Sequence, residues 1–138
     1  MTFRLLPLRL LPLRLLLTTL ISLSFAIPAS AINTESRIPL MGCRGHYAAS
    51  GSARYVTIRN EQKKADEEIT TIEIENVPLP PGTVLVVYVS DKQVGIIKLD
   101  AKQAGKLTLK SGSKSYPPPI DPATTVHIKT RAGKLVLW

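Results

Sequence analysis

The chain has 138 residues, 44% of them hydrophobic and 20% charged, and its 18 Lys+Arg against 10 Asp+Glu give a formal net charge of +8. This length accommodates one domain and excludes a large multidomain protein. Because there is a single cysteine, an intramolecular disulfide is excluded as well.

The first 31 residues have the three regions of a secretion signal in order. A basic segment with three arginines precedes the apolar run 15–27, and Ala29-Ser30-Ala31 matches the small-x-small pattern of a cleavage site. The apolar run is shorter than the about 20 residues that span a membrane. We therefore expect cleavage after Ala31 and a secreted or periplasmic chain, 32–138, without a transmembrane anchor. Cleavage removes three arginines and no acidic residue, leaving 15 Lys+Arg against 10 Asp+Glu, a net charge of +5.

The mature chain reads as strands and turns. Residues 32–51 show no sustained period, so they are expected to be a leader or an irregular first strand before a β domain at 52–138. Further runs alternate apolar and polar residues or are rich in β-branched residues, and predict strands. These runs are 53–59, 70–77, 83–89, 94–99, 106–110, 124–130 and 134–138.

Four segments carry more specific expectations. The nearly continuous apolar run 83–89 predicts a central strand covered on both faces. The charged stretch 61–68 lacks an apolar face and predicts a solvated hairpin loop. Pro117-Pro118-Pro119 predicts a stiff, extended bridge between two sheets, or a preordered ligand for a partner. Trp138 is expected to plug one end of the core. About seven short strands with short connections predict one small antiparallel β-sandwich, with a small β-barrel as the alternative.

The region 77–109 carries a resemblance. It combines a Pro-Pro-Gly-Thr turn at 80–83, valines up to Val89, Val94-Gly95 after a tight turn, Asp100, Gly105 and Leu107-x-Leu109. This combination resembles a recurring module of small secreted bacterial proteins, compact β-domains of mostly uncharacterised function. The chain departs from that module at Lys92-Gln93, where a glycine usually tightens the hairpin. The resemblance implies the fold and no active site, because its residues are turn and core residues.

Groups suited to catalysis are few. His127 is expected on the outward side of its strand, where a general base would lack an orienting partner nearby in sequence. Cys43 and His46 are three residues apart, but a tetrahedral zinc site needs more ligands than the chain offers. No phosphate-binding glycine loop, zinc-protease helix or nucleophile elbow is present. We therefore expect no enzymatic activity and no cofactor or metal, with a small hydrolase or inhibitor as an alternative.

Cys43 has two further interpretations. In an oxidising compartment a lone thiol is buried, paired with another molecule, or free and reactive, so Cys43 is a candidate free thiol. Leu40-Met41-Gly42-Cys43 resembles a lipobox, but polar residues separate it from the apolar core of the signal. Lipid anchorage through Cys43 is therefore not expected.

Exposed lysines are the remaining candidate site. A cationic patch for an anionic envelope polymer would consist of Lys92, Lys98, Lys102, Lys106, Lys110 and Lys114. The favoured alternative is that these lysines protect sheet edges from pairing with other chains. Nucleic acid is not an expected partner because no aromatic residues interleave with the lysines. The favoured function is a non-enzymatic extracytoplasmic binding or structural module for an envelope polymer or another protein, with polyanion binding as the alternative.

Overall fold

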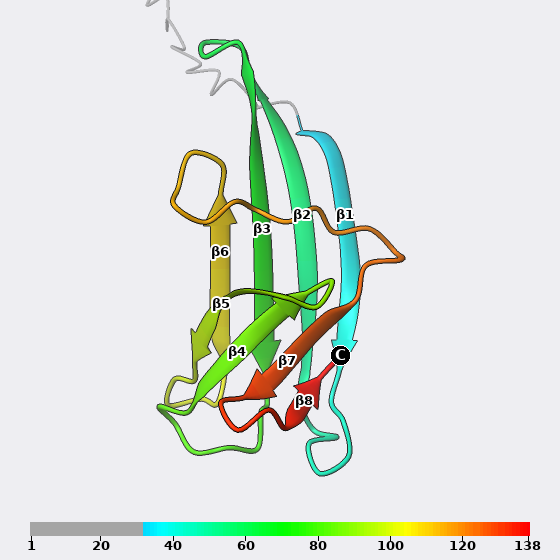
Figure 1. Cartoon of the computed structure of the whole chain (residues 1–138), viewed down its shortest axis with the longest axis vertical. Helices are drawn as coiled ribbons and strands as arrows, with labels where there is room; N and C mark the ends of the chain where they lie inside the picture. Colours follow the sequence, from blue (N-terminus) through cyan, green and yellow to red (C-terminus); the bar gives the residue numbers. More distant parts are fainter. Residues whose placement is uncertain (1–31) are drawn as a thin grey trace, which may run out of the picture.

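The computed structural model describes residues 32–138, and the predicted signal sequence at 1–31 lies outside the described residues. The described part forms eight strands in two four-stranded antiparallel sheets and contains no helix (Figure 1). The prediction of a small antiparallel β-sandwich is confirmed, and the two sheets do not close into the alternative barrel. Within residues 32–138, no helix is long and apolar enough to cross a membrane.

Sheet A has the order β1-β2-β3-β6. It consists of β1 (Ile32–Met41), β2 (Ser50–Asn60), β3 (Ala65–Glu75) and β6 (Gly105–Lys110). Residues 32–51, which the sequence left as a leader or an irregular first strand, form β1, the loop after it and the first two residues of β2. β1 is therefore a regular strand of sheet A. The charged stretch 61–68 is a hairpin turn only as far as Lys64, because β3 starts at Ala65.

Sheet B has the order β5-β4-β7-β8 and crosses part of sheet A obliquely (Figure 1). It consists of β4 (Val84–Val89), β5 (Lys92–Lys98), β7 (Val126–Thr130) and β8 (Leu135–Leu137). The position of β4 inside the sheet is as expected for its apolar run. The expectation that both its faces are covered is wrong, since its residues alternate between buried and half-buried. In the described residues only sheet A packs on sheet B, so one face stays partly wet.

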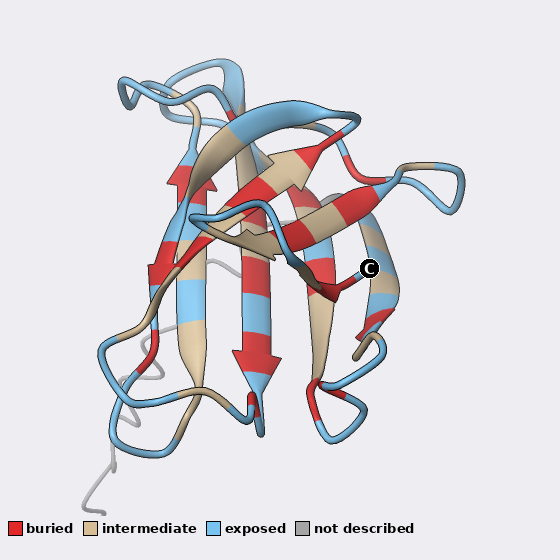
Figure 2. Cartoon of the chain, turned by 60° about the horizontal axis from the view of Figure 1, so that its bottom comes forward, coloured by how far each residue is buried: buried red, intermediate tan, exposed pale blue. Residues whose placement is uncertain are grey.

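The core lies between the two sheets, where the buried residues gather (Figure 2). Ile72 and Ile74 of β3 are almost fully buried, and Leu85, Val87 and Ile128 of sheet B are fully buried. Glu73 and Glu75 alternate with these isoleucines and are exposed. This confirms the predicted inward and outward faces of the run 70–77, because successive residues of a strand point to opposite faces.

The proline-rich segment between β6 and β7 connects sheet A to sheet B, as the sequence predicted. It runs across β3, β2 and β1 in Figure 1. Thr70 is fully buried, and its Oγ1 donates a hydrogen bond of 2.6 Å to the carbonyl oxygen of Pro118. Pro117 and Ile120 are buried as well. The segment therefore satisfies the buried threonine and adds apolar side chains to the core.

The last strand ends differently from the prediction. Trp138 is 63% exposed, so the expectation that its ring plugs the core is wrong. Leu137 is fully buried and takes that place. The reason is a reciprocal backbone pair in which Met41 N donates to Trp138 O at 2.8 Å and Trp138 N donates to Met41 O at 3.1 Å. Met41 is itself exposed, and directly paired residues share a face, so the pairing turns Trp138 outward as well.

Glu68 joins β3 to two tyrosines. The Tyr55 hydroxyl donates a hydrogen bond of 2.7 Å to the Glu68 carboxylate. Hydrogen bonds from Tyr55 and then Tyr116 lower the pKa of Glu68, against a smaller opposing effect of desolvation. Burial raises the pKa of Tyr55, and the bond to Glu68 raises it further. These shifts make the contact pH-dependent.

We expect Tyr55→Phe to raise the pKa of Glu68 towards its ordinary value. A carboxylate with a lowered folded-state pKa contributes stability above its unfolded pKa, and this contribution is lost as the pH falls through the folded value. The part of the Tyr55→Phe penalty that comes from Glu68 is therefore present at neutral pH and absent in acid. NMR titration of Glu68 and unfolding at several pH values measure both effects. Tyr88→Phe, on the outer side of sheet B, is the control; an unchanged Glu68 titration in Tyr55→Phe would contradict the prediction.

Candidate functional site

The outer face of sheet A, which is the side turned away from sheet B, carries charged and hydroxyl side chains in cross-strand rows. One row consists of Pro39, Ser52, Glu73 and Lys106, and the next consists of Arg37, Arg54, Thr71 and Thr108. Each row takes one residue from each of the four strands, because antiparallel register places directly opposite residues on the same face. Residues far apart in the chain therefore meet on this face.

Two ion pairs lie on the outer face. Arg54 Nε is 2.7 Å from Glu35 Oε1, and Lys106 Nζ is 3.0 Å from Glu73 Oε1. The hydrogen bond from Arg54 lowers the pKa of Glu35, as do the charges of Arg54 and Arg37, while desolvation opposes them. The side chains of both pairs are 42–59% exposed, so water screens them and they contribute little to stability.

Arg37 differs from the other two cations of these rows. It lies directly opposite Arg54, whose guanidinium is already paired with Glu35. Its Nη2 donates a hydrogen bond of 3.1 Å to Ser52 Oγ, and it has no ion pair among residues 32–138. A guanidinium has five N–H donors in a planar fork. Arg37 therefore keeps donors available for another molecule.

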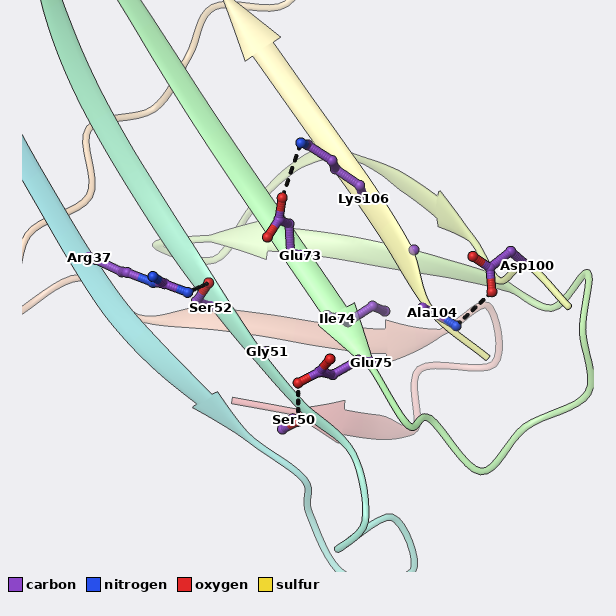
Figure 3. A pocket seen from close by; sticks show the side chains of 11 residues that line it. Arg37, Ser50, Gly51, Ser52, Glu73, Ile74, Glu75, Asp100, Ala104 and Lys106 are labelled. Carbon is purple, nitrogen blue, oxygen red and sulfur yellow. Dashed lines mark hydrogen bonds and ion pairs between the residues drawn. The ribbon is translucent and has the colours of Figure 1, made fainter. Parts of the chain in front are cut away.

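The outer face is hollowed at these rows (Figure 3). One hollow of about 520 Å³ reaches from β1 to the turn before β6, and an adjoining one of about 380 Å³ lies towards Glu35. Both are lined by Arg37, Ser52, Glu73 and Lys106, so we treat them as one feature, the charged trough. At its floor Ser50 Oγ donates a hydrogen bond of 3.3 Å to Glu75 Oε1.

The six candidate lysines lie along the two edge strands on one side of the sandwich. All are exposed, and they come from β5, the β5–β6 turn, β6 and the loop after β6. Lys106 is paired with Glu73 and lines the charged trough. The other five have no ion pair within the described part of the chain. Because β5 and β6 are the free edges of their sheets, this placement fits the edge-protecting role.

Cys43 and His46 lie in the loop between β1 and β2. Cys43 is half-buried, and desolvation raises the pKa of its thiol, which reduces the reactive thiolate. His46 is 4% exposed, and its Nδ1 has no hydrogen-bond partner in residues 32–138. No group of three or more metal-ligating side chains occurs within this described range. The loop therefore contains a protected thiol and a buried imidazole without the partners of a metal site.

His127 lies on the outer side of sheet B, as its sequence position predicted. Its residue is half-buried while its neighbours Val126 and Ile128 are buried. Its Nδ1 is 3.9 Å from Asp91 Oδ1, and the Asp91 side chain is 89% exposed. His46 lies in the β1–β2 loop and His127 in β7, and neither lines the charged trough. The trough therefore has carboxylates but no histidine in its lining.

Comparison with known proteins gives no assignment: no protein-family model matches the chain, and no curated protein or solved structure is significantly similar to it.

The trough residues in β1 and β2 were missed in the sequence. Glu73, Glu75 and Lys106 were predicted to face water, and all three are exposed. Arg37, Ser50 and Ser52 fall in or beside the segment read as irregular. The available signal was the alternation of Glu35, Arg37 and Pro39 with Ser36, Ile38 and Leu40. Pro39 obscured it, because proline is unusual in strands except at edges.

Proposed function

We propose that this chain is a secreted, non-enzymatic β-sandwich that binds its ligand on the outer face of sheet A. The observation that carries the proposal is the charged trough, the place where hydroxyl, carboxylate and guanidinium groups from several strands converge on an accessible hollow. Ligand sites are typically concave and combine a few well-placed polar groups. A rigid sheet holds such groups more precisely than a loop does.

Secretion is supported by the signal pattern at 1–31. Cleavage after Ala31 leaves every strand of the described residues in place. Cleavage at the lipobox-like Cys43 would remove β1, including Leu40, which is 3% exposed and part of the core. This difference favours a free, unlipidated mature chain.

The second candidate function is polyanion binding along the edge lysines. It is favoured by the five exposed lysines that have no ion pair in residues 32–138. The two surfaces differ in charge balance, because four acidic and three basic side chains line the trough, whereas lysines predominate along the edge. An edge site should lose affinity steeply with salt, whereas the trough should be much less sensitive.

Binding to cell-envelope material from the producing cells separates the two candidates. The trough variant carries Arg37→Ala, Glu73→Ala and Glu75→Ala, and the matched edge variant carries Lys92→Ala, Lys98→Ala and Lys102→Ala. We expect co-sedimentation to fall about tenfold or more for the trough variant and to stay near wild type for the edge variant. All six residues are exposed, so both variants should unfold at wild-type denaturant concentrations.

If the edge variant loses binding, the trough variant keeps it and binding depends strongly on salt, the lysine edge is the binding surface instead. Equal binding by all three proteins would remove both candidate surfaces.

A further inference from the structure

Trp138 is paired with Met41 at the end of β1, where the chain end lies beside β1 in Figure 1. Met41 shares the face of Pro39 and Arg37, and it is paired in register with Ser50. Its reciprocal hydrogen bonds with Trp138 put the two side chains on the same side of the ladder. Met41 is 65% exposed and Trp138 is 63% exposed. An accessible indole therefore adjoins the row that contains Ser50 and Glu75.

This indole is unusual for its surroundings. An exposed tryptophan leaves a large apolar ring in water, which burial against a partner would relieve. The side chains that the neighbouring trough exposes are small or polar: serine, threonine, alanine and charged residues line it together with glycines, and its one large apolar lining residue, Ile74, is buried. Trp138, with Met41 beside it, gives a small apolar spot next to a longer polar surface. This combination suits a ligand with one apolar face and many hydroxyl groups.

The charge balance of the trough further limits which class of ligand fits it. Four acidic and three basic side chains line its two hollows: Glu35, Glu73, Glu75, Asp100, Arg37, Arg54 and Lys106. A polyanion would meet the carboxylates, and a polycation would meet Arg37. A neutral molecule with many hydroxyls avoids both costs, because its hydroxyls donate to carboxylates and accept from guanidinium N–H groups.

We propose that the outer face of sheet A binds a neutral oligosaccharide, with one sugar ring stacked on Trp138 and the following sugars hydrogen-bonded along the charged trough. This inference rests on the proposed function and names its ligand class. Glu73, Glu75 and Ser50 accept from sugar hydroxyls, and Arg37 donates to them with the donors that have no carboxylate partner. From Met41 to Glu35 the strand covers about 20 Å, which accommodates several sugar rings.

The single tryptophan of the chain reports on this site directly, since a sugar stacked on Trp138 changes its fluorescence. The probes are maltohexaose, cellohexaose and 1,4-linked mannohexaose, whose sugars all carry vicinal diols, with heparin as the charged comparison. We expect at least one neutral hexasaccharide to shift the emission saturably, with little effect of salt, and heparin to have none. Calorimetry with that sugar should show an affinity lower by about tenfold or more for Trp138→Ala. Trp138→Phe should keep an affinity near that of the wild type, because its ring still stacks on the sugar.

Arg37→Ala should lower the affinity for the same sugar. Ile96→Ala should leave this affinity unchanged, because Ile96 is exposed on sheet B. Wild-type affinity in Trp138→Ala would overturn the proposal, as would a fluorescence response to heparin alone.

Treatment of the envelope material distinguishes failure of this inference from failure of the proposed function. Periodate destroys vicinal diols of sugars, whereas protease destroys proteins. We expect periodate to abolish binding and protease to leave it. If binding survives periodate and is lost with protease, the saccharide inference is wrong. Weaker binding by the trough variant would then still support the proposed function. If the trough variant also binds normally, the saccharide inference and the proposed function are both wrong.

Discussion

Ile72→Ala is expected to lower the free energy of unfolding by about 2–5 kcal/mol, the range for large-to-small changes at fully buried sites. Ile72 is fully buried in β3, in register between Ala53 of β2 and Leu107 of β6. Its removal costs the transfer of its methyl groups and leaves a cavity in a core that has no disulfide to support it. Domains of this size have only about 5–15 kcal/mol of stability, so the change is a large fraction of the total.

Ile96→Ala is the matched control, since the substitution is the same but the residue is 51% exposed. We expect it to cost less than about 1 kcal/mol. Denaturant unfolding monitored by circular dichroism measures both variants, with an unchanged slope against denaturant. Equal losses for Ile72→Ala and Ile96→Ala would mean that the core does not lie between the two sheets.

Gly42→Ala is expected to destabilise the corner between β1 and β8 by about 3 kcal/mol, the upper range for overpacking. A Cβ at Gly42 would overlap the carbonyl oxygen of His46 and lie 2.9 Å from that of Ala49. Both atoms belong to the backbone of the loop, which cannot rotate away as a flexible side chain can. Gly42 N also donates to Ala49 O at 3.0 Å, so a shift breaks the loop's own bond.

Gly82→Ala separates this steric effect from backbone strain. Gly82 has φ of 86° and open space around its Cβ position. Alanine there costs only the left-handed conformation, about 1–2 kcal/mol. Unfolding should therefore show a larger loss for Gly42→Ala, together with faster hydrogen exchange of the Cys43 and Trp138 amides. A smaller loss at Gly42 than at Gly82 would contradict the close approach of the loop.

The strand faces were predictable where one strand alone decides them. Ile72 and Ile74 inward, with Glu73 and Glu75 outward, follow from a period of two within β3. Trp138 was placed wrongly because three residues of β8 give no periodicity, and its pairing with Met41 decides the side it faces. The first strand was left open because its charges and Pro39 resemble a loop, although they fit an edge strand.

The charged trough could be predicted only in part. That Lys106 and Glu73 face water is local information, but their 3.0 Å ion pair requires β6 to pair with β3. Two strands of the other sheet, β4 and β5, separate them in the chain. No local pattern specifies which of several free edges a strand joins. The saccharide hypothesis depends on strand pairing as well, since its residues come from β1, β2, β3 and the end of the chain and meet only through the β1–β2, β2–β3 and Met41–Trp138 pairings.

By itself, the sequence determined that the chain is all-β, which residues of most strands are apolar and where the turns lie, because propensity and periodicity are properties of neighbouring residues. It also predicts a secretion signal at 1–31. The tertiary structure decided the assembly: β1 joined the sheet, Leu137 rather than Trp138 entered the core, and Arg37, Ser52, Glu73 and Lys106 met in one trough. These outcomes depend on register and strand order, which are set by packing the two sheets against each other.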